Sequence, residues 1–540
     1  MTDISRQQAA PFTPVTQGLR VHAARTPEAP CLKGETPLSY GALYTQVARL
    51  AGHLQIAGLS EGHRLAIWTQ KGPQAITAIW GALEAGLAYI PLDPSQPGER
   101  AARILAEAHP EVLVVSPDLL AHLPGPLPDS LQLVIFSDCA DTAELPALPV
   151  PSLRLDRLAP VPHHPAQPQP DWIAAILFTS GSTGVPKGVQ MSYRNLDAFI
   201  GWAVKEFSLG PADVIGNHAS FHFDLSTFDL FAAARAGASV WPIPTTEQSN
   251  IIAISEGLKR YRVTTVYAVP SILTMLTRAK RLAPAHAPAL RQIAFAGEVF
   301  PIGDLRAMAA QVGADMPLYN LYGPTETNAC TFHRITPADL AADHPAPIGR
   351  PLPGQRAFIR DPETGHAVAP GEKGELVIEG TMVTPGYLNH PDPAIQRDHA
   401  AGRHATGDIV SEQPEGLVYH GRIDRIVKIN GNRVELGEIE AALARHPAVA
   451  QAAVVQILGP RGAALVAFVT PVHAAHPPAQ MEILEHLRDL LPRFMLPRHM
   501  KIMSDLPRTP NGKTDMRHLQ RIAEDAFLPG PRHSHRVEPV

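Results

Sequence analysis

The sequence predicts an α/β protein, in which a large N-terminal domain of layered sheets and helices is followed by a small α+β C-terminal domain. The chain has 540 residues, 45% of them hydrophobic, which is enough to bury more than one core. Helical and strand-like patterns alternate through about the first 420 residues, as expected for helices packed on a mainly parallel sheet. After Gly421 the pattern changes to short strands with two helices.

Composition and charge argue against several classes of partner. The chain carries 46 Lys and Arg against 51 Asp and Glu, so no overall field attracts nucleic acid or an anionic membrane. The N-terminus lacks the pattern of a signal peptide, and no apolar run approaches the roughly 18 residues that span a bilayer. Cys31, Cys139 and Cys330 are far apart and odd in number, which fits neither a disulfide framework nor a zinc knuckle. We expect a cytoplasmic protein.

Short apolar runs predict the strands of the large domain. They span residues 63–70, 111–116, 131–137, 172–178 and 238–244. The Pro-rich stretch 141–170 is interpreted as a surface connector inside this domain, because a strand follows it at once.

The last part of the chain predicts a compact α+β unit. Residues 425–436 read as a hairpin whose strands join at Asn430-Gly431, a favoured tight turn. A helix, two strands and a second helix are expected at 437–446, 449–457, 464–470 and 481–491. Residues 529–540 are expected to be a disordered tail.

The stretch TSGSTGVPKG, residues 179–188, predicts a phosphate-binding loop. A strand that ends in Gly, Ser and Thr presents backbone N–H groups and hydroxyls to an anion, and one lysine adds an ammonium. It is not the usual P-loop of NTPases, because Pro186 precedes the lysine and no Ser or Thr follows it. A flexible loop without a ligand is the alternative. The predicted phosphate-binding residues are Thr179, Ser180, Gly181, Ser182, Thr183, Gly184 and Lys187.

Two carboxylates follow turns at the ends of predicted strands. In LYNLYGPTETNAC, residues 318–330, Glu326 comes after a Gly-Pro turn, where a carboxylate beside bound phosphates can hold Mg²⁺. In HATGDIV, Asp408 comes after a Thr-Gly turn, where a carboxylate can accept from both ribose hydroxyls. Each is also compatible with a solvated surface residue.

Taken together, these segments resemble one family, the adenylate-forming enzymes, which include acyl-CoA synthetases, luciferases and the adenylation domains of nonribosomal peptide synthetases. Nine motifs stand in the order that the family requires and cover about residues 15–525. They are LSYGAL (38–43), LEAGLAYIPLDP (83–94), TSGSTGVPKG (179–188), FDLSTFDL (223–230), NLYGPTE (320–326), GELVIEG (374–380), TGD (406–408), GRIDRIVKINGNRVELGEIE (421–440) and PNGKTD (510–515).

The resemblance implies a two-step reaction and a mobile lid. Family members bind ATP and Mg²⁺, join a carboxylate to the α-phosphate with release of pyrophosphate, and rotate the small domain so that a thiol can attack the acyl-adenylate. It implies a core at residues 1–420 that binds ATP and amino acid, a hinge at 421–424 containing Asp424, and a lid at 425–528.

The resemblance also assigns residues to the nucleotide. It implies that the loop from Thr179 to Lys187 clasps the phosphates, with Thr183 in the reaction, and that Glu326 binds Mg²⁺. It places Asn320, Tyr322, Gly323 and Thr325 at the nucleotide, and Asp408 with Arg422 at the ribose. It also implies that Lys513 bridges the substrate carboxylate and the nucleotide, where an ammonium would offset the charge that builds on the α-phosphoryl group. Ala405 and His404 depart from the family's arginine and tyrosine, which affects only the ribose contact.

The substrate is expected to be an apolar amino acid. Asp224 falls where amino-acid-activating relatives place the carboxylate that pairs with the α-ammonium, and an unpaired carboxylate there would disfavour neutral acids. Asp229 is the alternative for this role. Beyond Asp224 and Lys513 the implied wall carries no charge, which excludes charged side chains. It consists of Asp224, Leu225, Phe228, Ala268, Ala294, Ala296, Leu321, Ala329, Cys330 and Lys513.

Several strings resemble the stand-alone enzymes that load L-proline onto a carrier protein. Ala268, Ala294 and Ala329 are smaller than the residues of those enzymes, so we expect L-proline or a substituted proline. D-alanine–carrier protein ligases, other amino-acid adenylation enzymes and acyl-CoA synthetases remain alternatives, as does a nucleotide-binding scaffold without catalysis. The chain has no Gly-Gly-x-Ser site after its last motif, so a separate carrier protein with phosphopantetheine is expected to be the acceptor.

Overall fold

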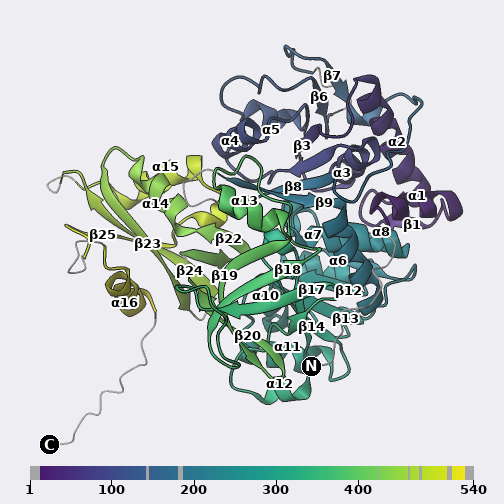
Figure 1. Ribbon diagram of the computed structural model, residues 1–540. Coiled ribbons are helices and arrows are strands. Elements are labelled where there is room, and N and C mark those ends of the chain that lie inside the picture. Colours follow the sequence, from purple (N-terminus) through teal and green to yellow (C-terminus); the bar gives the residue numbers. More distant parts are fainter. Residues whose placement is uncertain are drawn as a thin grey trace, which may run out of the picture. The chain divides into compact units, whose positions relative to one another are not determined.

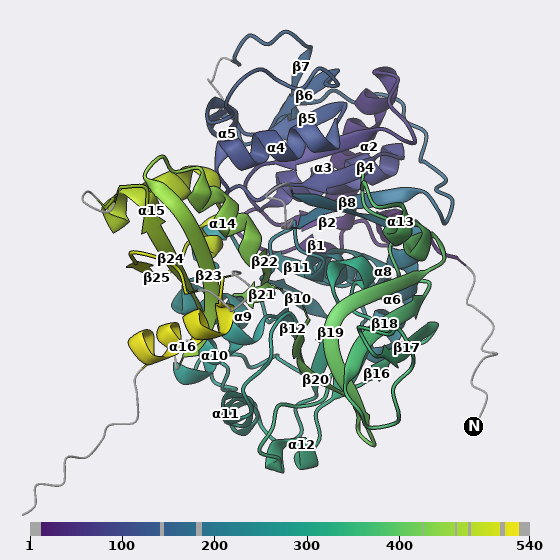
Figure 2. The ribbon, with the colours of Figure 1, turned by 60° about the vertical axis from the view of Figure 1, so that its left-hand side comes forward.

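The computed structural model describes residues 12–140, 145–179, 186–423, 425–459, 462–473, 477–507 and 514–528, which form two compact units. The first unit holds the described residues of Met1–Pro94, Ala101–Thr179 and Lys187–Asp424. The second holds those of Ser95–Arg100, Ser180–Pro186 and Arg425–Val540. Figure 1 and Figure 2 show the elements of each unit. Asp424 and residues 529–540 lie outside the described residues, and the hinge at 421–424 stays a prediction.

A seven-stranded sheet forms one layer of the first unit. Its neighbours are parallel except for the last pair, in which β8 and β9 run antiparallel. The order is β7 (Ser152–Arg154), β6 (Leu133–Phe136), β5 (Val112–Val115), β3 (Arg64–Trp68), β4 (Ala88–Pro91), β8 (Ile173–Thr179) and β9 (Lys187–Ser192).

One strand of this sheet lies inside the Pro-rich stretch that was interpreted as a connector. β7 pairs parallel with β6, from Val134 with Ser152 to Phe136 with Arg154. Because β7 is an edge strand, the prolines that flank it do not interrupt the hydrogen bonds of an inner strand.

A nine-stranded sheet forms a second layer. Its central strands are parallel, and antiparallel strands close both edges. The order is β16 (Arg350–Pro351), β15 (Thr331–Arg334), β14 (Leu318–Tyr322), β13 (Gln292–Phe295), β12 (Thr265–Ala268), β10 (Val214–Asn217), β11 (Ser239–Pro242), β1 (Pro30–Leu32) and β2 (Leu38–Ser39). The prediction of an α/β fold with mainly parallel sheets is confirmed.

A smaller antiparallel sheet and the helices complete the first unit. The sheet contains β17 (Gln355–Arg360), β18 (Gly374–Gly380), β19 (Arg403–Gln413) and β20 (Gly416–Arg422). Sequence signals fix several helix ends, such as Ser192 with Asn195 in a capping box at the start of α6. The helices up to residue 400 are α1 (Thr16–Arg25), α2 (Tyr40–Ile56), α3 (Pro73–Ala85), α4 (Gly98–Ala108), α5 (Pro117–Ala121), α6 (Tyr193–Glu206), α7 (Leu225–Thr227), α8 (Ala233–Ala236), α9 (Ile251–Arg260), α10 (Pro270–Arg278), α11 (Ile302–Val312), α12 (Pro337–Ala341) and α13 (Pro393–Ala400).

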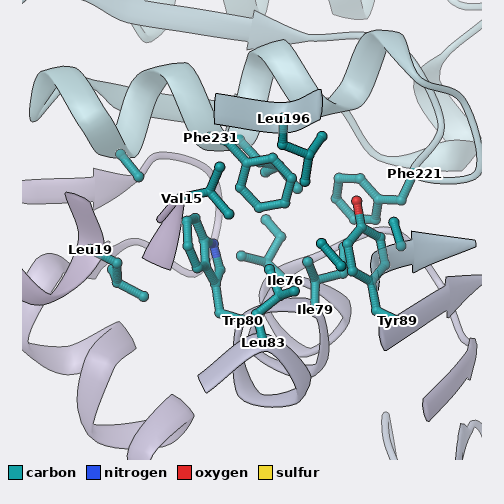
Figure 3. Packing of buried hydrophobic residues seen from close by; sticks show 14 of the residues in the cluster. Val15, Leu19, Ile76, Ile79, Trp80, Leu83, Tyr89, Leu196, Phe221 and Phe231 are labelled. Atoms are coloured by element: carbon teal, nitrogen blue, oxygen red, sulfur yellow. The ribbon is translucent and has the colours of Figure 1, made fainter. Parts of the chain in front are cut away.

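The main core of the first unit takes side chains from both large sheets and from α2, α3 and α6. Figure 3 shows Ile76, Ile79 and Trp80 of α3 facing Phe231. Phe231 belongs to a π-helical turn, η2 (Phe228–Ala232), that joins α7 to α8. The rings of Trp80 and Phe231 meet edge to face with centroids 5.1 Å apart, a favourable aromatic geometry. The core therefore fixes the segment that directly follows Asp224.

The second unit is the predicted α+β arrangement of hairpin, helices and strands, with a core of its own. Its elements are β21 (Ile426–Ile429), β22 (Asn432–Glu435), α14 (Leu436–Ala444), β23 (Val449–Gly459), β24 (Gly462–Pro471), α15 (Gln480–Leu490), β25 (His499–Ile502) and α16 (Met516–Phe527). β21 and β22 pair from Ile426 with Glu435 to Ile429 with Asn432, across the Asn-Gly turn. In the described part of the chain, every helix is too short or too polar to cross a membrane.

Gly257 in α9 provides a test of the packing on the outer side of the nine-stranded sheet. A Cβ at this position would lie 1.9 Å from the Trp241 ring, so Gly257→Ala should destabilise the protein by about 1–3 kcal/mol although alanine favours helices. Gly303→Ala in α11 is the matched control, because an added Cβ meets nothing within 4 Å there. Thermal unfolding should show a lower midpoint for the first variant only, and equal midpoints would contradict the packing described.

Candidate active site

The carboxyl ends of the parallel strands carry several of the predicted site residues of the first unit. Neighbouring parallel strands β10, β12, β13 and β14 all end at the same edge of the nine-stranded sheet. Asn217 ends β10, Ala268 ends β12 and Tyr322 ends β14. Ligands of open α/β sheets bind at this edge, so the topology brings together residues that are far apart in sequence.

The predicted phosphate loop is described only at its two ends. Thr179 ends β8 and pairs in register with Lys187 at the start of β9. The hydroxyl of Thr179 is buried and has no hydrogen-bond partner among the described residues. Ser180, Gly181, Ser182, Thr183 and Gly184 lie outside the described residues, as does Lys513. A buried hydroxyl without a partner is costly in the unliganded protein, so this atom is suited to a polar ligand.

Asp408 and Arg422 form a buried ion pair across neighbouring strands. They are register partners on β19 and β20, and Nη1 of Arg422 donates to Oδ1 of Asp408 over 2.7 Å. The hydroxyl of Tyr322 donates to Oδ2 of the same carboxylate, and Nη2 of Arg422 donates to the Thr406 carbonyl over 3.0 Å. Burial and the Asp408 charge raise the pKa of Tyr322 well above its usual range, which keeps the phenol protonated as a donor. A carboxylate has about four acceptor sites, so Asp408 can accept further bonds from a ligand.

Glu326 lies in a constrained turn, η4 (Thr325–Thr327), directly after β14. A Cβ on Gly323 would lie 1.6 Å from the Asn328 carbonyl oxygen, so only glycine fits this close approach. The Glu326 side chain is buried, and its Oε1 accepts from the hydroxyl of Tyr387. Sequence reasoning missed Tyr387. The turn thus presents one oriented carboxylate, the type of ligand that Mg²⁺ takes together with phosphate oxygens. Asn320, two residues before Tyr322, donates to the Pro347 carbonyl over 2.8 Å.

His404, which departs from the family pattern, is buried against a second histidine. Its Nδ1 lies 2.9 Å from Nε2 of His399, which belongs to α13. The His399 ring packs edge to face on Tyr387 with centroids 5.1 Å apart. Burial lowers the pKa of His399, which favours its neutral form. The histidine pair therefore packs against the tyrosine that donates to Glu326.

Asp224 stands at the entry to a short helical segment. Its carbonyl accepts from both the backbone N–H and the hydroxyl of Thr227, at 2.9 and 2.6 Å. Its side chain is largely buried, at 9% exposure. Behind it, the Phe228 ring packs edge to face on Tyr267 at 5.3 Å. The segment thus holds one carboxylate beside an aromatic and aliphatic wall.

The structure gathers most of the predicted wall residues and separates two of them. The core that contains Phe228 also holds Ala294, Ala296, Leu321 and Ala329, with Leu225 packed against it. Ala268 lies instead in a second cluster, where it lines a small apolar cavity with Val266 and Ile272. Cys330 lies in a third cluster with Tyr322 and Ile348. For Ala268 the reason is the alternation of side chains along β12, in which its neighbour Tyr267 belongs to the main core.

Sequence reasoning also missed a buried polar group in contact with the segment that leads to Asp224. Nζ of Lys71, which follows β3, donates to the carbonyls of Asn217, His218 and Ala219 at 2.7, 3.1 and 2.9 Å. Nδ2 of Asn217 donates to Oδ2 of Asp229 over 2.7 Å. The signal in the sequence was a lone lysine directly after an apolar strand.

Comparisons with known proteins agree with this arrangement. Residues 19–388 match the family described as AMP-binding enzyme, and residues 438–513 match the AMP-binding enzyme C-terminal domain. The chain is 45% identical over 505 residues to an L-proline–[L-prolyl-carrier protein] ligase of Streptomyces coelicolor, covering 92% of this chain and 94% of that protein. A ligase of the same name from Pseudomonas fluorescens is 34% identical, covering 90% and 94%. The amide bond synthetase McbA from Marinactinospora thermotolerans has a similar structure, with a TM-score of 0.82, 25% identity and coverage of 96% and 100%.

The Asp408–Arg422 pair leads to a prediction on stability. Arg422→Met leaves a buried carboxylate without its cation and should destabilise the protein by about 3–5 kcal/mol. In the double variant Asp408→Asn/Arg422→Met no charge is left unpaired, so its loss should be smaller than the sum of the two single losses. Urea unfolding of the four proteins measures this coupling, and strictly additive losses would contradict the buried pair.

Proposed function

The chain belongs to the family of AMP-binding enzymes, and on that premise we propose that it activates an apolar amino acid, with L-proline or a substituted proline favoured, as an aminoacyl adenylate. The reaction consumes ATP and releases pyrophosphate. The aminoacyl group then passes to the phosphopantetheine thiol of a separate carrier protein. Both ligases compared above are named for L-proline and an L-prolyl-carrier protein, which supports this choice.

The observation that supports the proposal is a largely buried carboxylate, Asp224, that precedes Leu225 and Phe228, two apolar residues at the main core. A largely buried carboxylate binds the ammonium of an amino acid through a charge-assisted hydrogen bond and disfavours a neutral acid. The neighbouring alanines and Leu321 offer contact to an aliphatic ring and no partner for a charged side chain. Ala268, Ala294 and Ala329 are the small residues that would leave room for a substituent on that ring.

The residues at the strand ends fit a nucleotide and its metal. Thr179 and Lys187 would bind the phosphates, the first with a buried hydroxyl that has no partner among the described residues. Glu326 would hold Mg²⁺, which supplies charge neutralisation of the phosphate oxygens when bound. Asp408, oriented by Arg422, would accept from the ribose hydroxyls.

The chemistry requires positioning and charge stabilisation more than proton transfer. An oxygen of the substrate carboxylate bonds to the α-phosphorus, the bond from that phosphorus to the bridging oxygen breaks, and pyrophosphate leaves. In the second step the thiol sulfur bonds to the acyl carbon, the proton leaves the sulfur, and AMP departs with the former carboxylate oxygen. Lys513 would place an ammonium between the two anions of the first step, a role that stays a prediction because this residue lies outside the described part.

The decisive experiment is amino-acid-dependent ATP–pyrophosphate exchange with the purified full chain. The panel contains L-proline, substituted prolines, D- and L-alanine, and fatty acids. We expect strong exchange with L-proline or a substituted proline. Exchange with fatty acids and with no amino acid would refute the proposal. Stronger exchange with D-alanine than with any proline would favour the D-alanine ligase instead.

Transfer of the labelled amino acid to a holo-carrier protein, compared with coenzyme A and with free amines, identifies the acceptor.

The role of Asp224 can be tested by a single substitution. Asp224→Asn removes the charge but keeps the size, and should lower kcat/KM for the amino acid by about 10- to 150-fold, which corresponds to the loss of a charge-assisted hydrogen bond of about 1.5–3 kcal/mol. The KM for ATP should change little. Asp171→Asn is the matched control, because the Asp171 side chain is 83% exposed and forms a surface ion pair with Arg194. Equal activity of both variants would show that another group binds the ammonium.

A further inference from the structure

A buried lysine connects the end of β3 in one large sheet with the end of β10 in the other. Lys71 follows the last residue of β3 in the seven-stranded sheet by three residues, and its ammonium binds carbonyls at the end of β10 in the nine-stranded sheet. The lysine is 9% exposed and Asn217 is fully buried. A lysine so deep in the protein requires acceptors and an opposite charge.

The three carbonyls that it binds begin the segment that ends at Asp224. Nζ of Lys71 is the donor to Asn217, His218 and Ala219. It also lies 5.6 Å from the centroid of the Phe221 ring, within the range of a cation–π contact. Figure 3 shows Phe221 beside Tyr89 in the main core. The lysine therefore contacts this segment both at its start and near its middle.

The opposite charge comes from Asp229, in the π-helical turn just after Asp224. Its side chain is fully buried, and while Oδ2 accepts from Asn217, Oδ1 has no hydrogen-bond partner among the described residues. Burial lowers the pKa of Lys71 and raises that of Asp229, and each charge counteracts the shift of the other. Asn217 thus joins the two charged groups, because its carbonyl accepts from the Lys71 ammonium and its amide donates to the Asp229 carboxylate.

Both carboxylates act on the same neighbour. Burial raises the pKa of Tyr267, and the charges of Asp224 and Asp229 raise it further. Asp224 and Asp229 therefore both lie near Tyr267. Without Lys71, Asp229 would be a buried negative charge with no cation to balance it beside the same tyrosine.

We infer that Lys71 is a positioning residue for the amino-acid subsite: it fixes the segment 217–224 through three carbonyls and balances Asp229, so that Asp224 is the carboxylate that selects an ammonium. This inference rests on the proposed function, since it concerns how the same subsite distinguishes an amino acid from a neutral analogue. Lys71 touches neither substrate nor nucleotide in this account.

The test compares L-proline with tetrahydrofuran-2-carboxylate, in which an ether oxygen replaces the ring ammonium. Exchange of the parent with L-proline is measured first, and its absence would count against the proposed function and not against the role of Lys71. Lys71→Met should raise the KM for L-proline at least tenfold, leave the KM for ATP within twofold, and lower the preference for proline over the ether by a similar factor. Lys33→Met is the matched control, because Lys33 also donates to a backbone carbonyl, that of Tyr261, at the far edge of the nine-stranded sheet.

A second variant keeps the inference testable if Lys71→Met does not fold. Asp229→Asn leaves the lysine in place without its counter-charge, so it should weaken the use of L-proline and leave the use of the ether unchanged. An unchanged preference in both variants overturns the inference. So does a joint rise of the KM values for ATP and proline, which is the result expected of general structural damage.

Discussion

Carboxylates buried in the first unit must each be met by a donor, and this constraint organises its interior. Glu84 in α3 accepts from Nε of Arg20 over 2.9 Å, which connects the helix to the N-terminal part of the chain. Asp408 accepts from Arg422 and Tyr322, which connects the four-stranded sheet to the end of β14. A buried charge without its partner is far more costly than an exposed one, so these contacts define which strand ends can approach one another. The site is built from the same contacts that hold the layers together.

Local patterns predicted most of the fold, because hydrophobic period and turn residues act over a few neighbours. The apolar run 172–178 corresponds to β8 (Ile173–Thr179), and the Asn430-Gly431 turn joins the expected hairpin. β7 was missed, because its strand character comes from pairing with β6 and not from its own Pro-rich sequence. The bond between Lys71 and Asn217 spans 146 positions, so no local pattern could predict it.

Sequence motifs could predict which strand ends carry the residues of the candidate site. They could not predict toward which face of the sheet each side chain points. The motif residues at the ends of β12, β13 and β14 do lie at one edge of the nine-stranded sheet. Ala268 and Cys330 were expected in the wall with Ala294 and Ala329, yet each lies in a different cluster. Successive side chains of a strand point to opposite faces of the sheet. A position shared with relatives therefore specifies how far along the strand a residue lies more securely than it specifies the cavity that its side chain lines.

Asp224 and Asp229, the two carboxylates that follow β10, are suited to different tasks, although each is an aspartate that could bind an ammonium. Asp229 is fully buried, accepts from Asn217 and is balanced by Lys71, so a ligand would have to displace an existing partner to reach it. Asp224 retains 9% exposure at the start of the helical segment, and its backbone carbonyl is already fixed by Thr227. Asp224 directly precedes α7, whereas Asp229 is the second residue of the π-helical turn η2, so the two carboxylates belong to different turns of the segment. The segment thus divides the tasks: the fully buried carboxylate serves as the structural counter-ion of Lys71, and the carboxylate at the entry keeps partial access to the outside.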